Sequence, residues 1–176
     1  KALFFFFYVL PLWVADMAFR TPDFILDALR QRLEHPVLGY TMPPANFYPL
    51  MQQWITTHYN WNVKREWIGF LPGIVPGLAF AVQSLTEVGD EIIVQPPVYY
   101  PFFNVVKNNN RILVYNPLIE KDGKFVMDFD DLEKKISAKT KLFILCNPHN
   151  PGGRVWTREE LQRFAGICEK HNVIIV

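Results

Sequence analysis

The sequence has little cysteine and no long block of charge of one sign. Its 176 residues include 2 cysteines, and its 18 basic and 17 acidic residues give a net charge of +1. Binding to nucleic acid or to an anionic membrane surface needs a basic patch, so we expect neither. Cys146 and Cys168 have no paired spacing that would indicate a metal site or a disulfide. We therefore expect a cytoplasmic protein with reduced, buried cysteines and a small molecule as its ligand.

Other absences limit the function further. The sequence contains neither the G-x-G-x-x-G pattern of a dinucleotide site nor the G-K-[ST] of a P-loop. The apolar run at residues 2–15 is too short to cross a membrane. Asp128, Asp130 and Asp131 precede a predicted helix that ends in two lysines, which favours a helix start over a metal site. No metal is expected.

Strand and helix patterns alternate after residue 64. A hydrophobic content of 50% with 20% charged residues is typical of a globular protein. Periodicity predicts strands at residues 67–71, 91–95, 111–115, 141–146 and 172–176, with helices at 76–85, after 101, at 130–136 and at 158–171. This order indicates an α/β fold, a mostly parallel sheet with helices on both faces. Because the last pattern is a strand with no covering helix after it, we expect the chain to be the front part of a longer protein.

Two amphipathic helices are predicted before residue 64. Apolar residues recur at helical spacing over Asp23–Leu33 and Phe47–Tyr59. Thr21 with Pro22 is a candidate cap and first turn for the first of these helices. The glycine and prolines between the two helices predict a loop, and this loop displays Tyr40.

The stretch 147–156, Asn-Pro-His-Asn-Pro-Gly-Gly-Arg-Val-Trp, is a candidate binding turn after a predicted strand. Asn147 and Asn150 each precede a proline, which restricts their backbone to extended conformations. An asparagine held at a strand's carboxyl end can offer one donor and one acceptor to a ligand. An ordinary strand-to-helix turn would use the same residue types. His149 has no visible base or nucleophile partner, and we interpret it as a turn residue.

A second turn, at residues 71–77, leads into a predicted helix. Pro76 is expected at the first helical position, where proline is tolerated best. Backbone N–H groups of Ile74, Val75 and Gly77 would then be free to bind a phosphate. A simple loop with a proline at the helix start is the alternative.

A third turn, at residues 95–101, would place Tyr99 and Tyr100 at the same edge of the sheet. Tyrosines are more often packed in a core than stacked on a cofactor. The coincidence of a phosphate-type helix start, aromatic rings and a rigid asparagine nevertheless describes a pocket for a flat, phosphorylated aromatic ring.

These motifs together resemble the fold-type I pyridoxal phosphate enzymes, the aspartate aminotransferase superfamily. Within it they are most similar to the carbon–sulfur lyases that include cystathionine β-lyase and cystalysin. The resemblance covers about residues 10–176 and rests on ordered stretches at residues 12–17, 38–41, 72–77, 96–102 and 146–156. It implies that residues 46–176 are the first part of a large pyridoxal-phosphate-binding domain. Residues 1–45 would be an N-terminal segment and substrate loop, partly belonging to a smaller domain.

The resemblance also implies pyridoxal 5'-phosphate as the cofactor and roles for individual residues. Tyr99 would stack on the pyridine ring, with Tyr100 beside it on the substrate side. Asn150 would hydrogen-bond the cofactor's phenolic oxygen, and the amides of Ile74 and Val75 would bind its phosphate.

Two further residues concern the substrate and a second subunit. Tyr40 would reach the phosphate of the neighbouring subunit's cofactor, which implies a homodimer. Ala15 would line the side of the site that receives the carboxylate of an amino acid substrate.

The activity implied is an α,β-elimination that yields a thiol, pyruvate and ammonia. A class I/II aminotransferase is the alternative. None of the lysines present has the context of the family's Schiff-base lysine, so that catalytic lysine is expected beyond Val176. A chain that truly ended there would be a non-catalytic fragment or a regulator.

Overall fold

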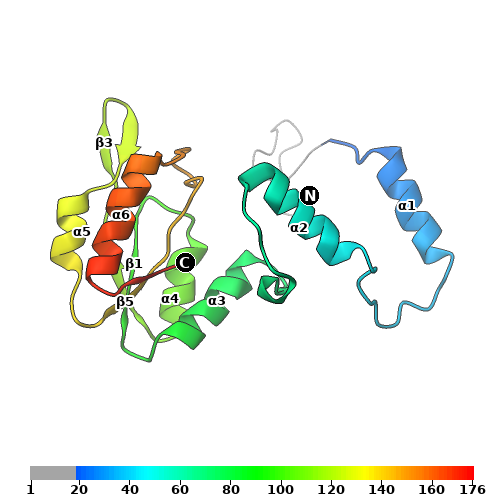
Figure 1. The fold of residues 1–176 in the computed structure, drawn as a ribbon, viewed down its shortest axis with the longest axis horizontal. Helices are drawn as coiled ribbons and strands as arrows, with labels where there is room; N and C mark the ends of the chain where they lie inside the picture. The colour runs from blue at the N-terminus through cyan, green and yellow to red at the C-terminus, as the bar shows by residue number, and fades with distance from the viewer. Residues whose placement is uncertain (1–18) are drawn as a thin grey trace, which may run out of the picture. The chain divides into compact units, whose positions relative to one another are not determined.

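The computed structural model describes residues 19–176 and contains two compact units (Figure 1). The first unit ends at Ile68, and the second runs from Gly69 to Val176. Ala15 and the apolar run at residues 2–15 lie outside the described residues. Most of the candidate site residues belong to the second unit.

A four-stranded parallel sheet forms the centre of the second unit. Its strands are β1 (Glu91–Val94), β2 (Ile112–Tyr115), β5 (Thr140–Phe143) and β6 (Ile174–Ile175), in the order β2-β1-β5-β6. Ile93 of β1 pairs with Val114 on one side and with Phe143 on the other. Because all of these strands are parallel, the turns that follow β1 and β5 lie at one edge of the sheet.

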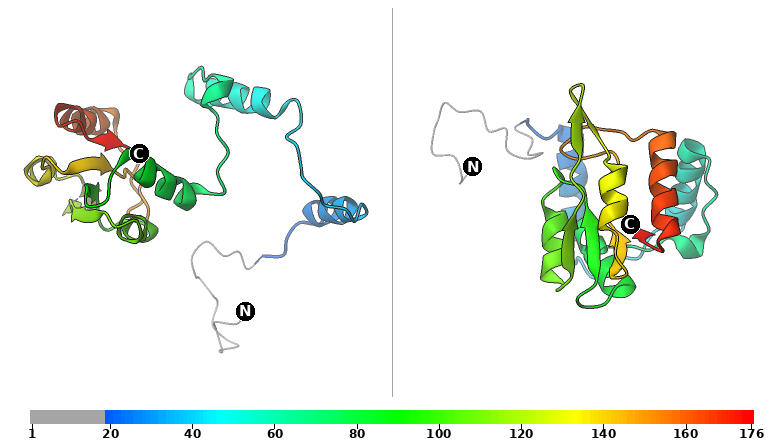
Figure 2. Two further views of the ribbon diagram at one scale, coloured as in Figure 1. Left: turned by 90° about the horizontal axis from the view of Figure 1, so that it is seen from below. Right: turned by 90° about the vertical axis from the view of Figure 1, so that its left-hand side faces the viewer.

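Helices cover both faces of this sheet (Figure 2). They are α3 (Ile74–Leu85) and α4 (Pro101–Asn108) on one face, and α5 (Phe129–Lys135) and α6 (Arg158–Lys170) on the other. Successive residues of β1 point to alternate faces: Ile92 and Val94 join the cluster with α3 and α4, while Ile93 joins the cluster with α5 and α6. The predicted α/β fold with helices on both faces is confirmed.

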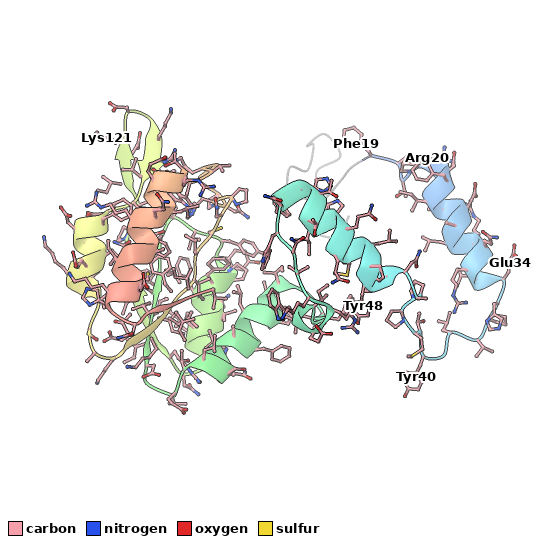
Figure 3. The ribbon with its side chains drawn as sticks, in the orientation of Figure 1. Phe19, Arg20, Glu34, Tyr40, Tyr48 and Lys121 are labelled. Carbon is pink, nitrogen blue, oxygen red and sulfur yellow. The ribbon has the colours of Figure 1, made fainter. Side chains whose placement is uncertain are left out.

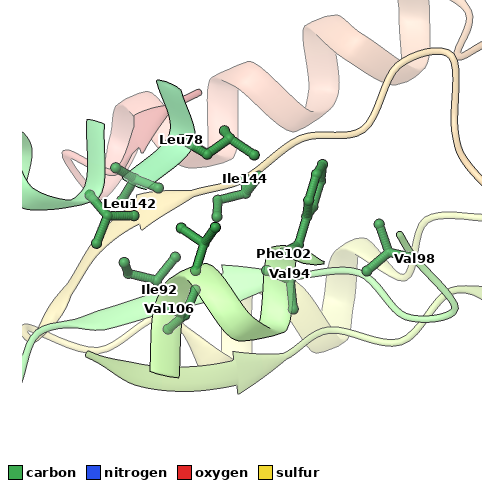
Figure 4. Packing of buried hydrophobic residues seen from close by; sticks show 10 residues of the cluster. Leu78, Ile92, Val94, Val98, Phe102, Val106, Leu142 and Ile144 are labelled. Carbon is green, nitrogen blue, oxygen red and sulfur yellow. The ribbon is translucent and has the colours of Figure 1, made fainter. Parts of the chain in front are cut away.

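The two apolar clusters are well buried. In the cluster under α3 and α4, Ile92, Val106 and Leu142 are 0% exposed (Figure 4). In the other cluster, the rings of Phe143 and Phe164 meet edge to face with their centroids 4.6 Å apart. Burial of one such side chain stabilises the fold by roughly 1.5–3 kcal/mol.

The structure differs from the sequence-based prediction in two segments. The strand predicted at residues 67–71 is wrong: Arg65–Trp67 forms a short 3-10 helix, η1, and residues 68–71 form no strand. Gly69 and Pro72 oppose a strand here, because glycine is costly to order and proline lacks the N–H that a ladder requires. The antiparallel hairpin of β3 (Ile119–Lys121) and β4 (Lys124–Val126) was not predicted.

Among its described residues the first unit contains two α-helices whose predicted bounds are confirmed, α1 (Asp23–Leu33) and α2 (Phe47–Tyr59). Thr21 does not cap α1. Instead Pro22 precedes the helix, and its carbonyl oxygen accepts the amides of Ile25 and Leu26 at 3.1 and 3.3 Å. No helix of residues 19–176 is long and apolar enough to span a membrane.

Side-chain contacts join α2 to the segment that follows it. The Arg65 guanidinium lies 3.2 Å from the ring centroid of Tyr48, which Figure 3 labels on α2. Gln52 donates a hydrogen bond to the carbonyl oxygen of Val63 at 2.8 Å. Val63 is the most buried apolar residue of residues 19–68, at 9% exposure.

Candidate functional site

The tyrosine turn follows β1 directly. Pro101 begins α4, and the amides of Phe102 and Phe103 donate to the carbonyl oxygens of Tyr99 and Tyr100 at 3.0 and 3.1 Å. The Tyr99 ring is half-buried and meets the Phe102 ring edge to face at 6.1 Å. Tyr100 is 66% exposed. The Tyr99 ring is thus packed against Phe102, whereas the Tyr100 side chain is mostly exposed to solvent.

The start of α3 supplies free backbone donors, although not all of those predicted. The helix begins at Ile74 rather than at Pro76, so Pro76 is its third residue, where a missing N–H still costs no helical hydrogen bond. The Gly77 amide donates to the Gly73 carbonyl oxygen at 3.1 Å, so the prediction that it is free was wrong. Ile74 and Val75 are the first two helical residues, whose amides have no partner four residues earlier within the helix.

The asparagine turn follows β5, and its two asparagines differ. Asn147 Oδ1 accepts the Trp156 amide at 3.3 Å, so this side chain braces the turn itself. Trp156 Nε1 also donates to the Cys146 carbonyl oxygen at 3.0 Å. The Asn150 side chain is exposed and makes no hydrogen bond within residues 19–176. The Asn147 side chain therefore already uses its oxygen within the turn, whereas both the oxygen and the N–H groups of the Asn150 side chain are available to a ligand.

Cys146 has a second role besides packing. Its sulfur accepts the backbone N–H of Asn150 at 3.2 Å, and the residue is half-buried against the cluster under α3 and α4 rather than buried as predicted. Cys168, in contrast, is a buried packing residue as predicted, and burial raises the pKa of its thiol to about 11. Both cysteines are free thiols.

Three turns converge on one apolar cluster. Val75 at the start of α3, Tyr99 after β1 and Cys146 after β5 all pack against the cluster that contains Ile92 and Leu142. These three residues come from segments that are far apart in the sequence. The structure therefore brings the helix start, the tyrosine turn and the asparagine turn to the same edge of the sheet.

Two further residues, Tyr40 and Ala15, were predicted to take part in the site. Tyr40 belongs to the first unit and is fully exposed at 105% (Figure 3). Ala15 lies outside the described residues.

A buried polar chain at the same edge was not predicted. Gln95 donates to Asn116 Oδ1 at 2.9 Å, and Asn116 Nδ2 donates to Asp131 Oδ2 at 2.9 Å. Gln95 and Asn116 are 2% and 0% exposed. Both follow strands directly, which is the sequence signal that could have found them, although their pairing depends on the order of the strands.

The acidic cluster before α5 is a helix start, as predicted. Asp128 caps the helix by accepting the Asp131 amide at 2.9 Å. Burial would raise the pKa of Asp131, but hydrogen bonds from Lys135 and Asn116, together with the charges of Lys135 and Lys134, outweigh burial and lower that pKa below its usual value. Within residues 19–176 no group of three acidic, histidine or cysteine side chains could hold a metal ion.

The donors at this edge fit pyridoxal 5'-phosphate. Two free amides at a helix start suit a phosphate group, because the N–H groups and the helix dipole both favour an anion. The half-buried Tyr99 ring offers an aromatic face, and the free Asn150 amide can donate to an oxygen on the cofactor's ring.

The comparison with protein families agrees with these features. Residues 9–176 match the family described as aminotransferase class I and II. The chain belongs to this family. The resemblance inferred from the sequence motifs is thus confirmed.

Individual relatives extend the comparison to carbon–sulfur lyases. Over 168 residues the chain is 49% identical to the cystathionine beta-lyase PatB of Bacillus subtilis, covering 95% of this chain and 43% of PatB. Cystalysin from Treponema denticola, whose structure contains pyridoxal 5'-phosphate, matches with a TM-score of 0.85 and 39% identity, covering 95% of this chain and 43% of cystalysin. A pyridoxal-phosphate-bound C-S lyase from Staphylococcus hominis matches with a TM-score of 0.83 and 38% identity, covering 93% of this chain and 43% of the lyase.

Aminotransferases are also among the relatives, including an aspartate aminotransferase of Sulfolobus acidocaldarius. The chain spans less than half the length of the relatives it matches.

Proposed function

We propose that the protein containing this chain is a pyridoxal-phosphate-dependent carbon–sulfur β-lyase. Its substrate would be an amino acid with sulfur on the β-carbon, such as cystathionine, and its products a thiol, pyruvate and ammonia. The observation that carries this proposal is the convergence of Val75, Tyr99 and Cys146 on one cluster, because it supports a single edge where the phosphate, the ring and its oxygen would be bound. The 49% identity to the cystathionine beta-lyase PatB supports the lyase reaction.

Four residues of this edge would contact the cofactor. The amides of Ile74 and Val75 would bind the phosphate, and the Tyr99 ring would stack on the cofactor. Asn150 would donate a hydrogen bond to the cofactor's phenolic oxygen from the amide that is free in the structure. When bound, pyridoxal phosphate supplies an electron sink for the substrate's α-carbon, while the protein supplies orientation and charge.

The substrate and subunit contacts are part of the same proposal. Tyr100, which is 66% exposed, would contact the substrate. Ala15 would line the side that receives the substrate carboxylate. Tyr40 would reach the cofactor of a second copy in a homodimer, which is consistent with its full exposure at 105% within this chain.

The proposal also covers the location of the protein and its domain organisation. We propose a cytoplasmic location, supported by two free thiols. Residues 1–45 would belong partly to a small domain and residues 46–176 to the large cofactor-binding domain.

The reaction is tested on the full-length protein by measuring pyruvate released from L-cystathionine without any 2-oxo acid. Release without an acceptor is the expected result. Strict dependence on a 2-oxo acid acceptor would instead assign the protein to the aminotransferases of its family.

Cofactor stacking is tested with two substitutions at one position. Tyr99→Ala should weaken pyridoxal phosphate binding roughly three- to tenfold, the usual worth of an aromatic stacking contact. Tyr99→Phe keeps the ring and should bind like the parent. Equal affinity for Tyr99→Ala and the parent, in a titration of the folded apo-protein, would refute the stacking assignment.

A further inference from the structure

His149 is buried inside the asparagine turn. It is 3% exposed, and its ring Nε2 lies 2.8 Å from the carbonyl oxygen of Pro97. A carbonyl oxygen can only accept, so Nε2 carries the hydrogen and donates it. The turn residue expected from the sequence is therefore a buried side chain with a defined partner.

This hydrogen bond joins the two turns of the proposed site. Pro97 lies two residues before Tyr99, and His149 lies directly before Asn150. Among the described residues, the bond from His149 to Pro97 is the only hydrogen bond between residues 95–100 and residues 146–156. The pairing of β1 with β5 brings the two turns together, and the imidazole adds the hydrogen bond that ties the turn of Tyr99 to the turn of Asn150.

Contacts on several sides fix the imidazole in place. Its ring meets the Trp156 ring edge to face at 5.6 Å. The backbone of His149 donates to the Arg154 carbonyl oxygen at 2.7 Å and accepts the Gly153 amide at 2.8 Å. A Cβ on Gly152 would lie 2.9 Å from His149 Cδ2 and 3.1 Å from Phe125 Cδ2, so the ring fills its space without room for one methyl group.

The chemistry of the ring argues against a purely stabilising role. Nδ1 of His149 is buried and has no hydrogen-bond partner among the described residues. A buried polar atom without a partner costs stability, which an apolar ring of the same shape would avoid. Buried polar atoms without a hydrogen-bond partner are rare in folded proteins, and such exceptions are expected at functional sites.

We propose that His149 is a positioning residue that sets the place of Asn150 relative to Tyr99 around the bound cofactor. It acts through its Nε2–H bond to Pro97, while the Cys146 sulfur accepts the backbone N–H of Asn150. The identity of the ligand rests on the proposed function. The inference about His149 is separate, because it concerns how the two turns are held.

The test compares variants of the full-length protein by titrating pyridoxal phosphate into the folded apo-protein. His149→Phe keeps the ring but removes the donor, and it should weaken binding about three- to tenfold, the net worth of one hydrogen bond. His149→Gln returns an N–H donor and should recover most of the affinity.

A spectroscopic readout separates positioning from general destabilisation. A donor to the cofactor's phenolic oxygen favours its deprotonated form. Displacement of Asn150 should therefore raise the pH midpoint of the bound cofactor's visible absorption in His149→Phe, with recovery in His149→Gln. If His149 only stabilised the fold, its replacement by Phe would lower the melting temperature without moving this midpoint.

Gly152→Ala provides a second variant if His149→Phe does not fold, because it keeps the imidazole but pushes against it. It should raise the same pH midpoint of the bound cofactor's absorption. Gly166→Ala on α6 is the matched control, since a Cβ there meets nothing within 4 Å.

Unchanged affinity and midpoint in folded His149→Phe and Gly152→Ala would overturn the positioning role and leave the proposed function standing. Equal losses in His149→Phe and His149→Gln would also overturn it. A parent protein that does not bind pyridoxal phosphate would overturn the proposed function, and this inference with it.

Discussion

The two units of the chain use similar sequence patterns but reach different degrees of burial. In α1, Phe24, Leu29 and Leu33 recur at helical spacing, yet they are 75%, 58% and 64% exposed. In α6, Phe164 and Cys168 follow the same kind of spacing and are each 1% exposed. The difference lies in what each unit offers its own helix: α6 covers the sheet of the second unit, whereas no residue of α1 is buried.

This contrast separates two pieces of information in an amphipathic pattern. The period of the apolar residues determines that a helix forms and which side of it is apolar. Burial requires a second surface, and the pattern does not say where in the chain that surface lies. The sheet supplies it on both faces for residues 69–176.

The largest expected effect compares two phenylalanines. Phe143→Ala should destabilise the protein by about 3–5 kcal/mol, because Phe143 is fully buried and its removal leaves a cavity. Phe24→Ala should change stability by less than about 0.5 kcal/mol, since Phe24 is largely exposed within this chain. Urea unfolding of the two variants measures both values.

A large loss for Phe24→Ala would break the comparison. It would mean that residues outside 19–176, or a second copy of the chain, cover the apolar face of α1. Phe19→Ala is a matched control because Phe19 is 85% exposed and precedes the helix.

A smaller effect is expected at the helix starts. Thr157 and Glu160 form a capping box at α6: the Thr157 side chain accepts the Glu160 amide at 3.2 Å, and the Thr157 amide donates to Glu160 at 2.8 Å. Thr157→Ala should cost about 1 kcal/mol.

Asn46 precedes α2 without capping it through its side chain, so Asn46→Ala should cost less than about 0.5 kcal/mol. Thermal unfolding of the two variants tests the difference. Equal losses at Thr157 and Asn46 would show that the capping box contributes nothing measurable.

The smallest effect concerns a carboxylate and its dependence on pH. Asp131 has a lowered pKa in the folded protein, so its stabilising contribution is present above the ordinary aspartate pKa of about 4 and is lost as the pH falls through the folded value. Asp131→Asn should therefore be slightly less stable than the parent at pH 7. The gap should close as the pH is lowered below about 4.

Asp23→Asn is the matched control in the first unit. Asp23 pairs with Arg20 at 2.6 Å, but the two side chains are 65% and 79% exposed, and such pairs contribute little. A stability gap between Asp131→Asn and the parent that stayed constant from pH 7 to pH 3 would contradict the assignment.

Helices were predicted correctly where the period of apolar residues and the flanking turn residues agreed, and a hairpin was missed because its turn residues were not considered. The helices Asp23–Leu33 and Phe47–Tyr59 were predicted to the residue. The hairpin at residues 119–126 was missed although Asp122 and Gly123, both with positive φ, form the Asp-Gly turn typical of two-residue hairpins.

By itself the sequence determined the alternation of strands and helices, the turn chemistry around Asn150 and the family. These properties depend on residues close together in the chain, whose period and steric preferences are local. Only the tertiary structure decided that Asn147 braces its own turn while the Asn150 side chain stays free, and that His149 is buried against Pro97. Those outcomes depend on contacts between strands β1 and β5, which are distant in sequence and become neighbours only when the sheet forms.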